Sequence, residues 1–347
     1  MTSTTVGLHS DAVGPCPTQV EALTAINVEA MLDAIGLAQL RRGRRWISQP
    51  CVPAARQFAC ELAEYDRRVG QRGLAQGAAW ILAQRVGRVE VAGQETVPRH
   101  GPLLVVANHP GLTDTVALFA SLPRKDMTIV AADRPFLRAL PQTSRSLLYV
   151  SERPEHRLSA VRRVAATLQY GRAVLTFPGG EIEPDPAIRP DARSALQRWS
   201  PSIGLLVKLV SEVQVVPAIV SGVLSARAQR HPFTRLRRRP EDREWLGAIL
   251  QLILPWHRAV TVRIAYGPPL AAADLLNSDS DSRAVTRKIV HAAQRLIEQP
   301  PQEWRTLMDP GNLEALIGAP APAHPADAPY TPAPTTRSER AAGESNL

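Results

Sequence analysis

The chain has 347 residues, of which 44% are hydrophobic, and its formal net charge is +9. This length is enough for one or two domains with a full core. No run approaches the roughly 18 to 20 consecutive apolar residues that cross a bilayer, and the N-terminal segment lacks the basic start and apolar core of a signal peptide. We therefore expect a cytoplasmic protein that lies on a membrane surface, at its inner face, without passing through it.

The positive charge is compatible with nucleic acid or with anionic lipid as a partner. Only Lys125, Lys208 and Lys288 among the 41 basic residues are lysines, a skew that codon bias explains as well as ligand binding does. No nucleic-acid-binding motif accompanies the charge, so no nucleic-acid partner is expected. Where the charge is functional, peripheral contact with an anionic membrane is the favoured explanation.

The composition of both chain ends predicts disorder, and a predicted helical segment follows the N-terminal one. Residues 1–17 and the Ala- and Pro-rich tail 318–347 contain little to bury. Between them, residues 18–86 carry three long Ala- and Leu-rich stretches, at 18–37, 52–69 and 72–86. Residues 18–86 are therefore predicted to form an N-terminal helical segment.

From residue 87 onward, short β-type runs alternate with helical ones. The predicted strands lie at 88–93, 103–107, 127–132, 146–150, 173–177, 213–220 and 259–267. Helical spacing of apolar residues occurs at 157–171, closed by Gly171, and at 283–301. Strands that are apolar on both faces and alternate with helices predict an α/β domain over 87–317, with a mixed, largely parallel sheet flanked by helices.

The stretch "LLVVANHPGLTDTVAL", residues 103–118, places polar residues directly after a buried strand. Ligands of open α/β sheets collect at the carboxyl ends of strands. A carboxylate at Asp114, in the first turn of the next helix, is within reach of one imidazole nitrogen of His109, leaving the other nitrogen free to accept a proton. An Asp that only stabilises the helix N-terminus is the alternative interpretation.

A second candidate segment is "AVLTFPGGEIEPD", residues 173–185. The predicted strand ends at Phe177, and Pro178, Gly179 and Gly180 form a turn whose backbone N–H groups are suited to an oxyanion. Two carboxylates follow, at Glu181 and Glu183. An ordinary loop explains the Gly and Pro residues equally well.

Taken in order, these motifs resemble the lysophospholipid and glycerol-phosphate acyltransferase superfamily, over residues 87–299. The first block of that family, Asn-His, four residues and Asp, matches Asn108, His109 and Asp114. The second, a strand followed by a phosphate-binding arginine, is matched by Arg153 one residue later than usual. The third, Phe-Pro-Glu-Gly-Thr, retains Phe177, Pro178 and Gly180 but has Gly179 at the glutamate position. The fourth, an apolar strand with Val-Pro, contains Pro217.

This resemblance implies an enzyme that moves a fatty acyl group from acyl-coenzyme A or acyl carrier protein to a hydroxyl of a glycerolipid or lysophospholipid. His109 is the implied general base and Asp114 its partner, with no metal and no cofactor beyond the thioester co-substrate. Asn108, Arg153, Pro217 and the third block are the implied substrate contacts. The altered third block leaves open whether Glu181 or Glu183 replaces the usual glutamate.

Two other functions fit the residues less well. A catalytically silent lipid-binding protein on the same fold is the main alternative, because the third block departs from the family pattern. A metal-dependent hydrolase would need further ligands such as His100, His156 or Glu181, and the sequence contains no compact metal-ligand spacing. Cys16, Cys51 and Cys60 are odd in number and form no Cys-x-x-Cys motif, which argues against a disulfide framework or a zinc site.

Overall fold

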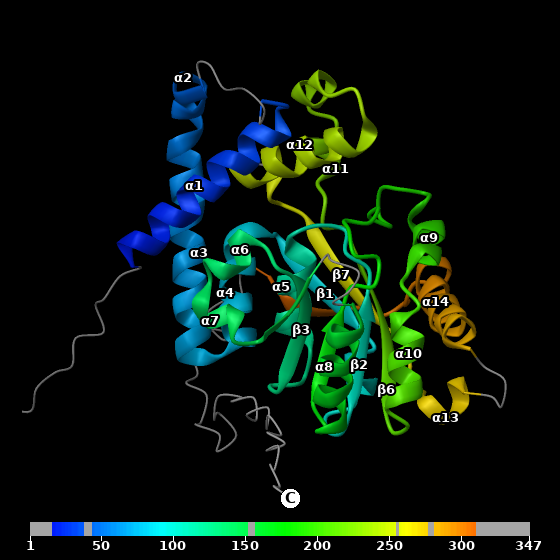
Figure 1. Cartoon of the computed structure of the whole chain (residues 1–347). Helices are drawn as coiled ribbons and strands as arrows, with labels where there is room; N and C mark the ends of the chain where they lie inside the picture. The colour runs from blue at the N-terminus through cyan, green and yellow to red at the C-terminus, as the bar shows by residue number, and fades with distance from the viewer. Residues whose placement is uncertain (1–15, 38–43, 152–156, 255–256, 277–280, 310–347) are drawn as a thin grey trace, which may run out of the picture.

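The computed structural model of the chain describes residues 16–37, 44–151, 157–254, 257–276 and 281–309 (Figure 1). Most of the segment 1–17 and all of the tail 318–347, for which disorder is predicted, lie outside the described residues. Helix α1 begins at Pro17, so the helical part of the chain starts one residue earlier than predicted. Arg153 also lies outside the described residues.

The N-terminal helices form a layer beside the sheet (Figure 1). They are α1 (Pro17–Ala34), α2 (Arg44–Ser48), α3 (Val52–Arg72) and α4 (Leu74–Arg85), with η1 (Gln49–Cys51) between α2 and α3. Gly73, at a φ of +86°, separates α3 from α4 in a backbone conformation that favours glycine. The three predicted helical stretches are therefore confirmed, and α1 and α3 pack through residues such as Leu23 and Ala59.

One nine-stranded sheet forms the centre of the molecule, in the order β4-β3-β5-β2-β6-β7-β1-β9, with β8 paired to β6. The strands are β1 (Arg88–Ala92), β2 (Leu103–Ala107), β3 (Met127–Ala132), β4 (Leu147–Val150), β5 (Ala173–Thr176), β6 (Gln214–Ser221), β7 (Thr261–Tyr266), β8 (Leu270–Ala271) and β9 (Arg305–Met308). Pairing is parallel except for β6 with β7, β6 with β8 and β1 with β9. This confirms the predicted mixed, largely parallel sheet.

Helices cover both faces of the sheet. On one face, Leu103 and Val105 of β2 pack with residues of α4 and of α5 (Thr113–Ser121). On the other, Leu104 and Val106 pack with α8 (Arg157–Gln169), α10 (Ser202–Leu209) and α14 (Ser282–Glu298). Because β2 is buried on both faces, truncating Leu104 to alanine would cost about 2 to 5 kcal/mol of the free energy of unfolding.

Shorter elements connect these layers. They are η2 (Gln94–Thr96), α6 (Pro135–Arg138), α7 (Pro141–Ser144), α9 (Ala192–Ala195), η4 (Leu196–Arg198), α11 (Ala226–Gln229), η5 (Pro232–Leu236), α12 (Pro240–Ile253) and α13 (Ala272–Leu275). Helix α12 packs on α1 and α3 through Leu246 and Ile249. Among the described residues, no helix is both long and apolar enough to span a membrane.

Pro217 lies in the middle of β6, a position that proline normally avoids in an interior strand. The pairing explains the exception. On the side away from β2, the first residues of β6 pair with β8 at Gln214 and Val215, whereas the pairing with β7 runs from Ala218 to Ser221. Pro217 stands next to Ala218, at the end of this pairing, and contributes only as an acceptor, since its carbonyl accepts from the Gly267 N–H at 2.8 Å.

Candidate active site

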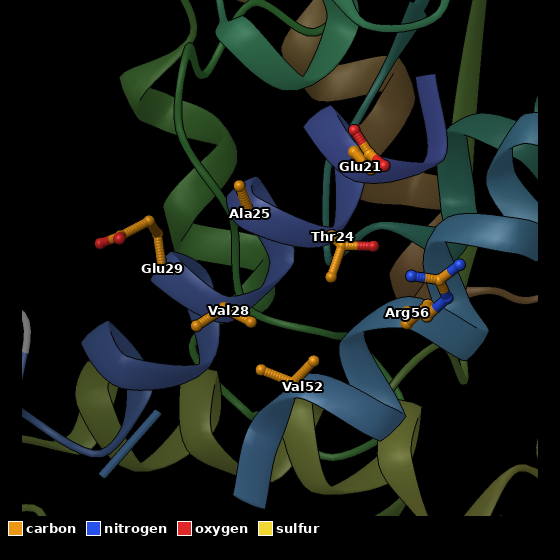
Figure 2. A pocket seen from close by; sticks show the side chains of 7 residues that line it. All are labelled: Glu21, Thr24, Ala25, Val28, Glu29, Val52 and Arg56. Atoms are coloured by element: carbon orange, nitrogen blue, oxygen red, sulfur yellow. The ribbon is translucent and has the colours of Figure 1, made fainter. Parts of the chain in front are cut away.

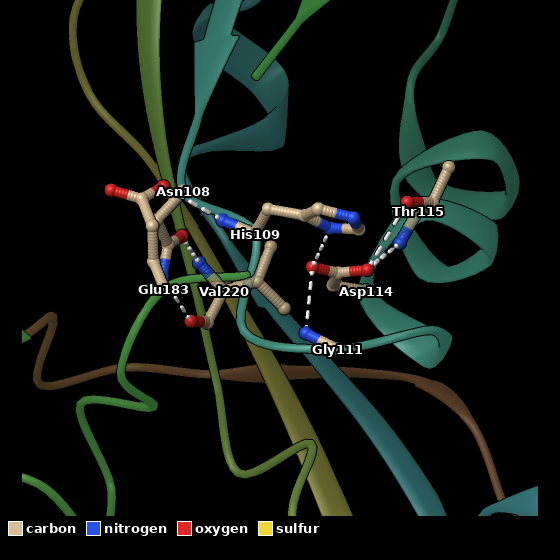
Figure 3. A network of polar contacts seen from close by, with 7 residues as sticks. All are labelled: Asn108, His109, Gly111, Asp114, Thr115, Glu183 and Val220. Atoms are coloured by element: carbon tan, nitrogen blue, oxygen red, sulfur yellow. Dashed lines mark hydrogen bonds and ion pairs between the residues drawn. The ribbon is translucent and has the colours of Figure 1, made fainter. Parts of the chain in front are cut away.

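The reacting pair predicted from the sequence comes together at the carboxyl end of β2. The chain leaves the strand at Ala107, turns through residues 108–112 and enters α5 at Thr113. This brings His109 Nδ1 to 2.8 Å from Asp114 Oδ2 (Figure 3). An Nδ1–H that donates to the carboxylate leaves Nε2 as the proton acceptor. The imidazole is partly accessible, with 26% of the side chain exposed, whereas Asp114 is fully buried.

Asp114 is itself held in place by the start of α5. Its Oδ1 accepts hydrogen bonds from the backbone N–H of Thr115, at 2.5 Å, and from the Thr115 hydroxyl, at 3.1 Å. Its Oδ2 also accepts from the N–H of Gly111, at 3.3 Å. These donors leave the carboxylate little freedom to rotate, so the orientation of the imidazole is determined by the fold of the turn.

Asn108 joins the site loop to the neighbouring strand. Its Nδ2 donates to the carbonyl of Val220 at 2.9 Å, and its Oδ1 accepts from the Val220 N–H at 2.7 Å (Figure 3). The side chain is only 1% exposed. The resemblance implied Asn108 and Pro217 as substrate contacts. In the structure both residues are buried.

Glu183 lies directly behind the histidine. Its Oε2 accepts from the His109 backbone N–H at 3.1 Å, and its Oε1 accepts from the indole N–H of Trp199 at 2.9 Å. Glu183 is buried, whereas Glu181 is exposed. Of the two glutamates that the sequence left open, the structure therefore brings Glu183 to His109.

Gly179 leaves the space that the Glu183 carboxyl group fills. A Cβ atom at this position would lie 2.8 Å from Glu183 Cδ and about as close to both carboxylate oxygens. The glycine that departs from the family pattern thus faces the carboxylate that stands beside His109.

The rest of the third block shapes the turn beside the imidazole. The Phe177 ring lies 4.7 Å from the His109 ring between centroids. Gly180 adopts a φ of +74°, and its N–H donates to the Phe177 carbonyl at 3.1 Å. The carbonyl of Pro178 accepts from Ser200 N–H at 3.0 Å. The expectation that the Gly180 N–H serves an oxyanion is therefore corrected, because this donor is used within the turn.

Charge around the imidazole favours its protonated form. Burial lowers the pKa of His109, but the charge and hydrogen bond of Asp114 and the charge of Glu183 outweigh this effect and raise the pKa above its usual value. For the carboxyl group of Glu183, burial has the opposite effect and raises the pKa. The hydrogen bonds from Trp199 and from the His109 backbone lower this pKa but do not cancel the effect of burial. A base with a raised pKa is stronger, provided that the pH keeps it unprotonated.

Two residues of this region were not identified from the sequence. Trp199 has no motif around it and reaches Glu183 only through the packing of the segment before α10. Asp185 is fully buried and accepts from the N–H groups of Gly222 and Leu224, just after β6. In the sequence, Asp185 is simply the last residue of the predicted loop "EIEPD". Nothing in that segment indicates that its carboxylate is buried.

A hollow in the N-terminal layer is separate from this site. It has a volume of about 340 Å³, and α1 and α3 line it with Glu21, Thr24, Ala25, Val28, Glu29, Val52 and Arg56 (Figure 2). No residue of the His109 site contributes to it. Within the described parts of the chain, no three His, Cys, Asp or Glu side chains are grouped as metal ligands; His156 lies outside those parts.

Comparison with known proteins shows which proteins this chain is similar to. The acyltransferase family model matches residues 88–221, a segment that contains the His109 and Asp114 pair as well as Gly179 and Glu183. Uncharacterized proteins of Mycobacterium bovis and Mycobacterium tuberculosis are each 26% identical to the chain over 231 residues. The matched part is 61% of this chain and spans 60% of the length of those relatives.

Among solved structures, the chain is similar to the 1-acyl-sn-glycerophosphate (LPA) acyltransferase PlsC from Thermotoga maritima. The sequence identity is 16% and the TM-score is 0.40, with 82% of this chain and 96% of that chain covered.

Proposed function

We propose that the chain transfers a fatty acyl group from an acyl thioester to a hydroxyl of a glycerolipid or lysophospholipid, an activity supported by the match of residues 88–221 to the acyltransferase family model. The observation that carries this proposal is the 2.8 Å contact between His109 Nδ1 and the buried Asp114 carboxylate. It orients a base whose ring remains partly exposed, which is what the deprotonation of an acceptor hydroxyl requires.

The proposed reaction begins with Nε2 of His109 taking the hydroxyl proton of the acceptor. The acceptor oxygen forms a bond to the thioester carbonyl carbon, giving a tetrahedral intermediate. When this intermediate collapses, the carbon–sulfur bond breaks, and the thiolate leaves with the proton from the imidazolium. Asp114 stabilises the imidazolium between the two steps. The co-substrate is acyl-coenzyme A or acyl carrier protein, and no further cofactor takes part.

Glu183 supports this reaction from behind the imidazole. It accepts the backbone N–H of His109 and, through its charge, makes the imidazole a stronger base. The carboxylate points its other oxygen at Trp199. We assign Glu183 a positioning role, because its two oxygens face groups of the protein.

The test is His109→Ala, assayed as thioester consumption with a panel of glycerolipid and lysophospholipid acceptors. General-base catalysis contributes roughly 10² to 10⁴-fold, so turnover should fall by about that factor while the fold is retained. Turnover close to that of the wild type would refute the mechanism. No consumption by the wild type with any acceptor would favour a catalytically silent lipid-binding protein.

We propose further that the protein meets its lipid at the surface of an anionic membrane, through the basic stretch 230–258. Arg238 and Arg239 are exposed there, whereas Arg237 is ion-paired with Asp242 at 2.9 Å. Reversing the charge at Arg238 and Arg239 should weaken co-sedimentation with anionic vesicles, since basic side chains near such a surface contribute about 1 kcal/mol each. Unchanged co-sedimentation would remove the membrane role from this stretch.

A further inference from the structure

A surface cavity follows β6, outside the His109 site. It has a volume of about 390 Å³ and is lined by Arg227, Arg230, His231, Pro232 and His257. Sites for small molecules occupy roughly 300 to 1,000 Å³, so this volume accommodates a compact charged group together with part of the molecule that carries it. We refer to it as the Arg227 cavity.

The Arg227 cavity lies at the same end of the sheet as the candidate active site. Strands β6 and β2 are parallel neighbours, so the segment after Ser221 and the loop at His109 both leave the carboxyl end of the sheet. Helix α11, which carries Arg227, lies next to α12 at that end of the molecule (Figure 1). Asp185 ties the segment after β6 to the third block.

Apart from Pro232, the side chains that line the cavity are basic, and no carboxylate among them offsets their positive charge. None of the five described residues that line the cavity is acidic. In the described parts of the chain, no ion pair joins a carboxylate to Arg227 or Arg230, although nearby arginines such as Arg189 and Arg237 do form such pairs. The guanidinium groups of Arg227 and Arg230 therefore concentrate positive charge at the mouth of a hollow surface.

The two histidines of the lining lie close together. His257 is only 3% exposed, and its ring meets that of His231 edge-on at 5.9 Å between centroids. His231 Nδ1 accepts the N–H of Phe233 at 3.3 Å, which leaves Nε2 to carry the proton of a neutral ring and to act as a donor. Burial, followed by the charges of Arg227 and His231, lowers the pKa of His257, as expected where positive charge is crowded.

We propose that the Arg227 cavity binds a phosphoryl group, contacted by the guanidinium groups of Arg227 and Arg230 and by the two imidazoles of the lining. Guanidinium groups donate paired hydrogen bonds that match the geometry of phosphate oxygens, and an anion relieves the repulsion among the lining side chains. The phosphoryl group belongs to a soluble ligand or to the headgroup of a phospholipid. This inference does not depend on acyl transfer, because it concerns binding alone.

The experiment compares the full-length protein with Arg227→Gln/Arg230→Gln. The matched control is Arg283→Gln/Arg287→Gln, which removes the same two charges from exposed positions on α14. Inorganic pyrophosphate is the soluble probe, titrated by calorimetry. Phosphatidylcholine vesicles with and without phosphatidic acid are the membrane probe, measured by flotation.

We expect the cavity variant to bind the probe more weakly by about tenfold or more for each guanidinium lost, while the control retains wild-type affinity. Partial retention in Arg227→Lys/Arg230→Lys would follow from charge without the paired donors. A loss seen with pyrophosphate indicates a soluble ligand, and a loss confined to phosphatidic acid vesicles indicates a headgroup. Equal weakening in the cavity variant and the control, or no binding of either probe by the wild type, would overturn the proposal.

Discussion

His109 and Glu183 form two hydrogen bonds with each other, although 74 residues of sequence separate them. The His109 N–H donates to Glu183 Oε2 at 3.1 Å, and the Glu183 N–H donates to the His109 carbonyl at 2.8 Å. This reciprocal pair fastens the loop that carries the candidate base to the loop that carries the altered third block. The two blocks therefore act as one unit, and a change in either is expected to be felt in the other.

The first prediction concerns the pH dependence of Glu183→Gln. The negative charge of Glu183 contributes to the raised pKa of His109, so its removal lowers that pKa. A general base works only when unprotonated, which means that kcat/KM falls as the pH drops through the pKa of His109. The acid limb of the kcat/KM profile should therefore move to lower pH in the variant.

Such a shift of the acid limb distinguishes a Glu183 that positions His109 from a Glu183 that only stabilises the fold. Measured at a pH well above the pKa of His109, the variant should also lose activity by roughly tenfold or more, because a misplaced catalytic group is costly. An acid limb that stays in place, together with a lowered melting temperature, would show that Glu183 only stabilises the fold.

The second prediction concerns Asp114→Asn. An asparagine amide placed opposite Nδ1 favours the tautomer with the proton on Nε2, which is the nitrogen that must accept the substrate proton. Turnover in the thioester-consumption assay should fall on the order of 10² to 10⁴-fold, with circular dichroism unchanged. Activity within a few-fold of wild type would mean that Asp114 serves only the start of α5.

The third prediction concerns Gly179→Ala. The added Cβ would lie 2.8 Å from Glu183 Cδ, so the carboxylate has to leave its two donors. Activity should fall in the single variant. In a Glu183→Ala background, however, the same change should cost little, because the group that the Cβ meets is gone. Equal losses in both backgrounds, a sign of independent effects, would contradict this explanation.

The fourth prediction concerns Asn108→Leu. This change keeps the approximate volume but removes both hydrogen bonds to Val220. Each buried polar group left without a partner costs about 1 to 3 kcal/mol, so the free energy of unfolding in urea should decrease measurably. A variant with wild-type stability and lost turnover would instead give Asn108 a direct role with substrate.

Much of the fold was predictable because buried parallel strands have a strong local signal. The strands over 103–107 and 127–132 have the predicted boundaries, and the remaining predicted strands differ by a residue or two at their ends. β9 was missed because its four residues, Arg305–Met308, have no alternating pattern and are ordered by antiparallel pairing with β1. β8 is shorter still, with two residues, and exists only as a partner of β6.

The candidate site was predictable to the extent that its residues follow one another in the chain. His109 and Asp114 are five residues apart, and a strand followed by a turn and a helix is enough to bring them together. The sequence did not decide whether Glu181 or Glu183 replaces the usual glutamate, because the choice depends on which carboxylate enters the space left by Gly179. Trp199 was missed for the same reason, since its contact arises from packing between separate segments.

The position of β2 has a consequence for how the protein loses activity. This strand is bordered by β5 and β6, is buried along its whole length, and ends one residue before Asn108, whose amide is bonded to Val220. Segments of this kind exchange their amide hydrogens only through the largest opening motions of a protein. The loop of His109 is therefore anchored to the slowest-exchanging part of the molecule, and heating should abolish chemistry and global structure in a single transition.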